Sequence, residues 1–163
     1  MLSEFDLSVL EILADDGRTD PAQIAVMTGR GEDEVKSVIK RLERDRIILK
    51  YPAMVNWDRV REDKVQALIE VRVTPQRDEG FDAIAEKIYE FEEVKSVYLM
   101  SGAYDLLVIV EGTNIKQLAL FVAEKLSTLE HVLSTATHFV LKKYKQDGVV
   151  MEKTRGDDRI QVS

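Results

Sequence analysis

The sequence of 163 residues contains no cysteine, which excludes disulfide bonds, cysteine-based zinc sites and a thiol nucleophile. It also lacks long apolar stretches. The longest uninterrupted one, residues 118–123, has six residues, far fewer than the roughly 18 needed to span a bilayer. Residues 1–4 show neither the basic start nor the apolar stretch of a signal peptide. We therefore expect a soluble, cytoplasmic protein without a membrane partner.

Signatures of the common enzyme classes are absent as well. The sequence has no GxxxxGK[ST], GxGxxG, HExxH or GxSxG pattern, and these mark nucleotide-binding loops, zinc proteases and serine hydrolases. The two histidines, His131 and His138, are expected to be structural or surface residues. An enzyme would have to rely on Asp105 with His138, so we expect no enzymatic activity, no cofactor and no metal.

Apolar and charged residues make up 45% and 33% of the chain, which indicates a folded globular protein. Acidic residues outnumber basic ones by 30 to 23, giving a net charge of −7. This balance argues mildly against a nucleic-acid partner. The apolar spacing is helical up to residue 55 and alternates from about residue 64. It predicts a domain of residues 1–55, a linker of 56–63, a domain of 64–144 and a polar tail of 145–163.

The first segment predicts three helices and a short β-wing. The first helix ends at Asp16–Gly17–Arg18, and the second begins with a capping box formed by Asp20 and Gln23 around Pro21. Gly29 is suited to the left-handed residue that ends this short helix. A third helix follows at once, and residues 47–51 and 53–55 then resemble two short strands.

The second segment predicts the order βαββαβ. Strands are expected over about 64–73, 94–100, 104–110 and 132–144, with helices beginning near Phe81 and Asn114. This split βαβ duplication is typical of the ferredoxin-like plait, so the fold class is α+β. Helices would cover one face of the sheet and leave the other in need of a partner, which predicts a homodimer. The tail is expected to be disordered or loosely attached, and Val149–Val150–Met151 could add an edge pairing.

The third helix carries the most suggestive charge pattern. Residues 36–50 contain six basic and two acidic residues, a local charge of +4. Because Val35, Val38 and Leu42 are expected inside, the cations lie outward, as in a helix that reads the major groove of double-stranded DNA. A solvated cationic face explains the charges equally well, and acids at 32–34 would repel phosphates. The candidate DNA-binding residues are Arg30, Lys36, Ser37, Lys40, Arg41 and Arg44.

A second candidate site is the loop between the two central strands. Gly102 permits close approach of a ligand, and Asp105 supplies a carboxylate that can hold the ammonium group of a small molecule such as an amino acid. A hairpin turn whose Asp caps its own backbone is the more common explanation. The candidate effector-binding residues are Tyr98, Met100, Ser101, Gly102, Ala103, Tyr104, Asp105, Thr135 and Thr137.

Together these residues resemble the Lrp/AsnC (feast/famine) family of transcriptional regulators, over about residues 6–143. The first half matches through Asp6, Asp16–Gly17–Arg18, Gly29 and Arg41–Leu42–Glu43. The second half matches the RAM (ACT-like) domain through residues 101–105 and 139–142. The sequence departs from the family at Gly31–Glu32–Asp33, where Ser-Pro-Thr is usual, and at Arg46, which replaces a common glycine.

The resemblance implies a DNA-binding regulator that forms dimers and often octamers. It implies a reading helix at residues 32–45 and an amino-acid effector held at residues 101–105 with help from Thr135 and Thr137. The alternative is a metabolite-sensing or protein-interaction module that has kept the fold and lost DNA binding. The acids at Glu32, Asp33 and Glu34 motivate that alternative.

Overall fold

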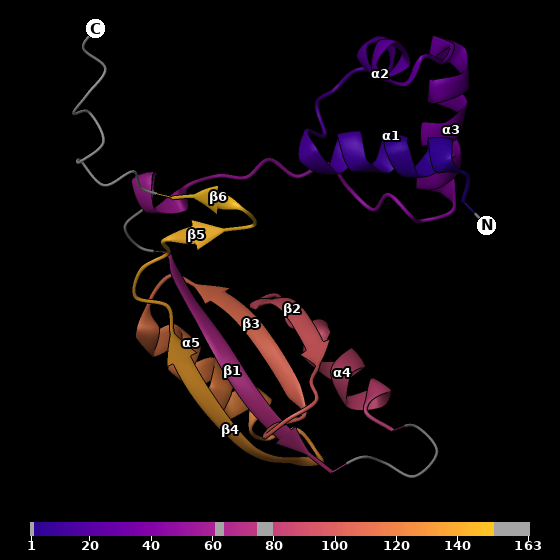
Figure 1. Ribbon diagram of the computed structural model, residues 1–163. Helices are drawn as coiled ribbons and strands as arrows, with labels where there is room; N and C mark the ends of the chain where they lie inside the picture. Colours follow the sequence, from indigo (N-terminus) through magenta and orange to yellow (C-terminus); the bar gives the residue numbers. More distant parts are fainter. Residues whose placement is uncertain (1, 61–63, 75–79, 152–163) are drawn as a thin grey trace, which may run out of the picture. The chain divides into compact units, whose positions relative to one another are not determined.

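The computed structural model describes residues 2–60, 64–74 and 80–151 (Figure 1). The chain divides into two compact units, Met1–Val55 and Asn56–Ser163. Within the described ranges, no helix has both the length and the apolar character required to cross a membrane.

The first unit contains three helices, α1 (Glu4–Asp15), α2 (Pro21–Thr28) and α3 (Glu32–Arg44). The expected capping box is confirmed, because Asp20 accepts a hydrogen bond from the backbone of Gln23 and the Gln23 side chain accepts from the backbone of Asp20. Gly29 ends α2 in the left-handed conformation, at φ 67°. The helices share a core of Val9, Leu13, Ile24, Ala25, Val35, Val38 and Leu42.

The β-wing expected over residues 47–55 is not formed, and that prediction was wrong. An isolated two-stranded hairpin is at best marginally stable in water, and Pro52 removes one backbone donor from it. The segment is instead fastened to α3. The Tyr51 hydroxyl donates to the Glu43 carboxylate at 2.8 Å, and burial together with this hydrogen bond raises the pKa of Tyr51 to about 12.

The second unit has the expected βαββαβ order. Its elements are β1 (Val65–Val73), α4 (Asp82–Tyr89), β2 (Val94–Leu99), β3 (Leu106–Gly112), α5 (Ile115–Phe121) and β4 (Val132–Phe139). A turn of 3-10 helix, η1 (Trp57–Arg59), precedes β1, and a π-helical segment, η2 (Val122–Leu126), continues α5. The strands form one antiparallel sheet in the order β2-β3-β1-β4 (Figure 1).

One face of this sheet is covered. Buried residues alternate along β1 and β3, as the period-two pattern predicts, and they pack with Ile84, Ile88, Leu118 and Phe121 of α4 and α5. The other residues of these strands, among them Leu68, Leu107 and Ile109, lie on the opposite face and are only partly buried. Within the second unit, the buried core of the described residues lies on the helix-covered face of the sheet.

The end of the chain differs from the expectation. The last strand of the sheet ends at Phe139 rather than near Tyr144, because Phe139 already pairs with Ala67, close to the start of β1. Val149 and Val150 form β6 (Val149–Val150), but it pairs with β5 (Lys145–Gln146) and not with the edge of the main sheet. The Asn56 side-chain amide donates to the carbonyl of Met151 at 3.1 Å, which ties this hairpin to the start of the unit. The tail beyond residue 151 lies outside the described residues.

Candidate nucleic-acid interface and effector loop

The helices α2 and α3 are joined by a tight turn at Gly29–Arg30–Gly31. Gly29 has a positive φ and Gly31 is the extended N-cap of α3, so three residues are enough to end one helix and begin the next. Val35, Val38 and Leu42 bury the inner side of α3. The remaining side of α3 is exposed, and a helix held from behind in this way has the geometry of a helix-turn-helix reading element.

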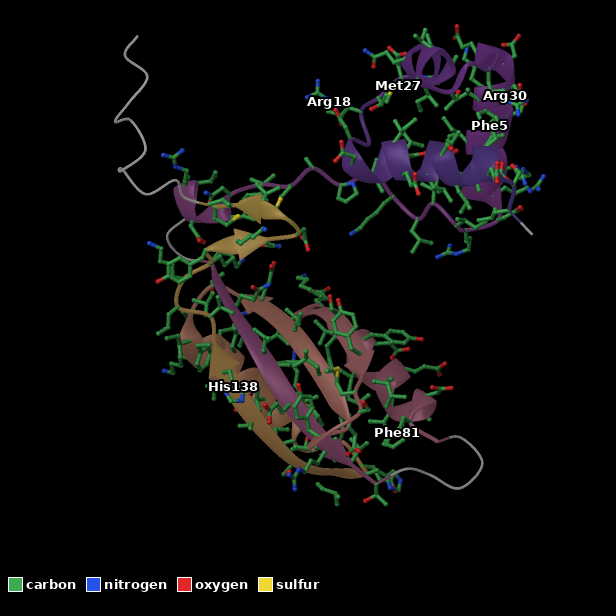
Figure 2. All side chains as sticks on the ribbon, in the orientation of Figure 1. Phe5, Arg18, Met27, Arg30, Phe81 and His138 are labelled. Carbon is green, nitrogen blue, oxygen red and sulfur yellow. The ribbon has the colours of Figure 1, made fainter. Side chains whose placement is uncertain are left out.

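Arg30, at the start of this element, contacts two other groups of the same unit. Its guanidinium lies 5.1 Å from the centre of the Phe5 ring (Figure 2) and 3.4 Å from the Glu34 carboxylate. The ring contact is a cation–π interaction that joins the helix-turn-helix to α1.

Lys36 and Arg44 are also paired within the unit. The ammonium of Lys36 lies 2.6 Å from Glu32, one helical turn earlier, and the guanidinium of Arg44 lies 2.9 Å from Asp45. The hydrogen bond and charge of Glu32 raise the pKa of Lys36, and those of Asp45 raise the pKa of Arg44. Both cations remain well exposed, so both can exchange a carboxylate for another anion.

Arg41 is held differently, because its partner is buried. It forms an ion pair with Asp6 of α1, whose side chain is 3% exposed, while Arg41 itself is 40% exposed. The backbone N–H of Ser3 and the Arg41 guanidinium lower the pKa of Asp6, against the opposing effect of burial. Arg41 therefore fastens α3 to α1.

Ser37 and Lys40 complete the predicted set. The Ser37 hydroxyl donates to the backbone carbonyl of Asp33 at 2.8 Å, and both residues are exposed. Lys40 is exposed, and among the described residues it has no ion-pair partner. The structure thus places all six predicted residues on the helix-turn-helix but gives four of them a carboxylate partner. The i,i+4 spacing of Glu32 to Lys36 and of Arg30 to Glu34 was visible in the sequence and could have signalled two of these pairs.

The predicted effector loop, residues 100–105, connects β2 to β3. Asp105 is fixed at three points: its N–H donates to the carbonyl of Val71, its carbonyl accepts from Met100, and its carboxylate accepts from the N–H of Val73 at 2.9 Å. Gly102 has a φ of 153°, a conformation that side chains rarely adopt. The carboxylate therefore caps a backbone N–H of the neighbouring strand β1, and not the backbone of its own turn as the common explanation of the sequence pattern holds.

The predicted effector residues outside the loop, Tyr98, Thr135 and Thr137, are divided between the two edges of the sheet. Tyr98 is 50% exposed and pairs with Leu107, which places it on the open face at the β2 edge of the sheet. Thr135 and Thr137 lie on β4, at the other edge. They pair with Val71 and Ile69, which places them on the helix-covered face, and Thr135 is 3.2 Å from the hydroxyl of Ser127.

His138 lies on the open face of β4 (Figure 2). Its imidazole is 3.3 Å from the Glu70 carboxylate on β1. His138 follows Thr137 in the chain and therefore lies on the opposite face of the sheet. Among the described residues, no hydrogen bond or ion pair joins His138 to Asp105.

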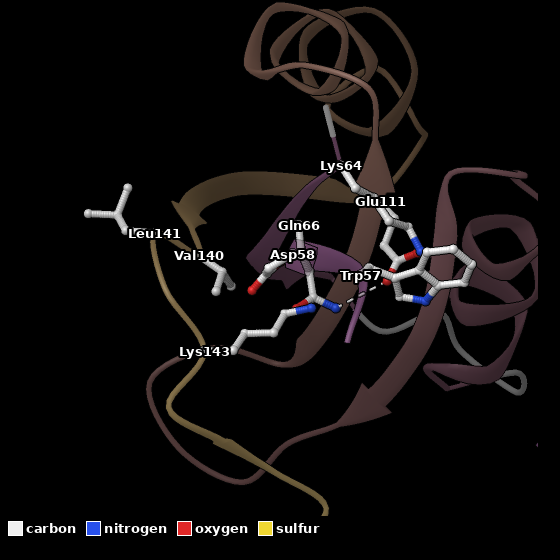
Figure 3. Close-up of a pocket in the computed structure, with 8 residues that line it drawn as sticks. All are labelled: Trp57, Asp58, Lys64, Gln66, Glu111, Val140, Leu141 and Lys143. Carbon is white, nitrogen blue, oxygen red and sulfur yellow. Dashed lines mark hydrogen bonds and ion pairs between the residues drawn. The ribbon is translucent and has the colours of Figure 1, made fainter. Parts of the chain in front are cut away.

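A pocket of about 300 Å³ was not expected from the sequence (Figure 3). Lys64 is one of the lining residues, and its ammonium lies 4.6 Å from the centre of the Trp57 ring and 2.8 Å from the Glu111 carboxylate. Gln66 donates to Glu111 at 3.5 Å. The pocket shares no residue with the predicted effector set. It is lined by Trp57, Asp58, Lys64, Gln66, Glu111, Val140, Leu141 and Lys143.

Comparison with known proteins supplies the context of these two sites. The family described as the Lrp/AsnC ligand binding domain matches residues 66–150. The HTH-type transcriptional regulator YugG of Bacillus subtilis is 50% identical over 163 residues, which cover 99% of this chain and 98% of that protein. Its similarity therefore includes the helical unit as well as the sheet.

Two similar solved structures contain L-methionine. One is a transcriptional regulator of Neisseria meningitidis, with a TM-score of 0.72, 23% identity, and coverage of 91% of this chain and 96% of that one. The other is a feast or famine regulatory protein of Mycobacterium tuberculosis, with a TM-score of 0.73, 22% identity, and coverage of 93% and 100%. At this identity the likeness shows that the fold is shared.

Proposed function

This chain belongs to the Lrp/AsnC family of transcriptional regulators, and on that premise we propose that it binds double-stranded DNA through α3 and responds to an amino acid or a related small metabolite. The observation that carries the proposal is the joining of two units in one chain. A three-helix unit with the tight turn at Gly29 precedes a βαββαβ unit that matches a ligand-binding family. The relatives are named as regulators and not as enzymes.

The choice of an amino acid rests on chemistry at the effector loop. The loop offers backbone groups and the Asp105 carboxylate, which together suit an ammonium group with a polar neighbour. Two proteins of the same fold were solved with L-methionine. Tyr98, Met100 and residues 101–105 form the core of the proposed site in one chain, while Thr135 and Thr137 can join it only from another copy.

We assign the open face of the sheet to a second copy of the chain. Leu107, Ile109 and Tyr98 expose apolar surface there beside the polar pair Glu70 and His138. The proposed assembly is a cytoplasmic homodimer that associates further, for example to an octamer. Effector bound between dimers would favour one arrangement and so change which paired half-sites the reading helices can occupy together.

The direct test is a gel-shift titration on the DNA upstream of the protein's own gene. The expected result is a shift at about 50 mM salt that weakens as salt rises, because phosphate contacts release counterions. Failure to bind at that salt concentration rejects the DNA-binding role. Light scattering of the same samples, with and without effector, measures the oligomer.

The effector is tested separately by a calorimetric screen of the common amino acids, with Asp105→Ala as the control. Heat of binding with the parent protein and none with the variant is the expected result.

Effector binding without DNA binding would favour a metabolite-sensing or protein-interaction module instead. The acids at the start of α3 are the observation that supports that second candidate, and replacing Glu32, Asp33 and Glu34 with Ser-Pro-Thr would then leave function unchanged.

A further inference from the structure

Three cations of the helix-turn-helix are already paired with carboxylates of the same unit. Arg30 contacts Glu34, Lys36 contacts Glu32, and Arg44 contacts Asp45, at 3.4, 2.6 and 2.9 Å. From Glu32 to Arg46 the chain carries five basic and five acidic residues. DNA phosphate approaching α3 therefore meets an ion pair at each of these three cations.

Two of these pairs involve the acids in the first turn of α3. Glu32 and Glu34 each lie four residues from their partner and are 48% exposed, as is Lys36. Exposed pairs of this kind contribute little to folding, so the fold does not require them. Their partners Arg30 and Lys36 stand at the end of the helix that faces base edges in a helix-turn-helix complex.

We propose that Glu32 and Glu34 are internal competitors of DNA phosphate, which hold Lys36 and Arg30 and thereby lower the affinity of α3 for DNA of any sequence. The inference rests on the proposed DNA-binding function and adds the residues that set its strength. A phosphate must displace a carboxylate from Lys36 before it can form its own contact, and the displaced Glu32 then repels the DNA backbone. One reading helix alone therefore binds weakly, and stable binding depends on pairing several.

Arg41 is outside this competition. Its partner Asp6 is buried, and removing a cation from a buried carboxylate is far more costly than breaking an exposed pair. Arg41 therefore stays with Asp6 when DNA binds. Lys40, by contrast, has no carboxylate partner among the described residues and is available to phosphate in the parent protein.

The test compares the parent protein with Glu32→Gln and Glu34→Gln on random-sequence duplex DNA. The matched control is Glu11→Gln, which removes the same charge from an exposed position on α1. Glu32→Gln is expected to raise affinity about two- to fivefold at 50 mM salt, the range for breaking an exposed ion pair. One added phosphate contact steepens the salt dependence by about 0.9 in log–log slope. The gain therefore shrinks about 3.5-fold between 50 and 200 mM salt.

A double-mutant cycle with Lys36→Ala shows whether the gain acts through this cation. Lys36→Ala alone is expected to change affinity little, and in the Glu32→Gln background it is expected to remove the gain. Thermal melts of every variant check that the fold is retained. The proposal is overturned if Glu32→Gln behaves like Glu11→Gln, or if its gain survives the loss of Lys36.

The result separates this inference from the proposed function. Binding by the parent protein with no gain in Glu32→Gln overturns the competition and leaves DNA binding intact. If the parent protein fails to bind any duplex at 50 mM salt, the DNA-binding role is rejected. In that case, DNA binding by Glu32→Gln supports the proposed competition. If Glu32→Gln does not bind DNA either, the competition is overturned together with the DNA-binding role.

Discussion

Arg41 of α3 is ion-paired with Asp6 of α1, and the Asp6 side chain is almost fully buried. Arg41 was a candidate DNA contact because it lies on the outer half of a cationic helix. The structure gives its guanidinium a role within the protein, because a buried carboxylate without its cation is strongly destabilising. The packing of α3 against α1 therefore depends on the charge of Arg41, which the sequence pattern had assigned to DNA binding.

Replacing Asp6 is expected to loosen the three-helix unit in a pH-dependent way. The Ser3 N–H and Arg41 hold the pKa of Asp6 below its ordinary value. A lowered pKa stabilises the fold above the unfolded-state pKa of about 4, and this contribution is lost as pH falls through the lower folded-state pKa. Asp6→Asn should lower the melting temperature by about 5 °C or more at pH 7. The difference from the parent protein should shrink as the pH falls below about 4, and a constant difference would contradict the assignment.

Arg46 adopts a left-handed backbone, with φ 55°. This conformation costs a residue with a side chain about 1 kcal/mol or more. Arg46→Gly is therefore expected to stabilise the protein by up to about 1 kcal/mol, since the strain removed exceeds the added freedom of the unfolded chain. Arg46→Ala is the control, because it removes the guanidinium and keeps the strain. Chemical denaturation measures both, and equal effects would show that the backbone is not the cause.

Local signals explain how much of this fold could be predicted. The capping box at Asp20 and the left-handed Gly29 depend only on residues close by in the chain. The alternation of apolar and polar residues along β1 indicates a strand with one buried face. The pair of Arg41 with Asp6 joins positions 35 residues apart, so no spacing rule could reveal it. The same limit applies to Thr135, whose place on the far edge of the sheet follows from strand order and register. The β-wing failed because its residues have strand-like character but no neighbouring strand to pair with.

Gly112 ends β3 where α5 packs closely on the sheet. A methyl group there would lie 2.8 Å from Cδ2 of Leu118, which is fully buried, and 2.8 Å from Oε1 of Gln117. Gln117 cannot turn away freely, because that oxygen accepts from Thr113. Gly112→Ala should therefore destabilise the protein by about 1–3 kcal/mol in chemical denaturation. Gly31→Ala, where a methyl group meets nothing within 4 Å, is the comparison and should cost clearly less.

Two substitutions at Asp105 separate its structural and proposed binding roles. Asp105→Ala leaves the N–H of Val73 without its acceptor and should cost about 1–2 kcal/mol of stability. Asp105→Asn keeps an acceptor oxygen and should melt close to the parent protein. It nevertheless loses the charge that an ammonium group needs, so calorimetry should show weakened effector binding by Asp105→Asn and no heat of binding with Asp105→Ala. Unchanged effector binding by Asp105→Asn would place the effector elsewhere.

Lys40 provides the final prediction, because it is the cation of α3 without a carboxylate partner among the described residues. Lys40→Ala should weaken binding to any duplex and reduce the slope of log affinity against log salt by about 0.9, the effect of one lost phosphate contact. Lys116→Ala removes the same charge from the exposed surface of α5 in the other unit and should leave that slope unchanged. Gel-shift titrations from 50 to 200 mM salt measure both slopes. Equal slopes for Lys40→Ala and the parent protein would mean that Lys40 does not contact phosphate.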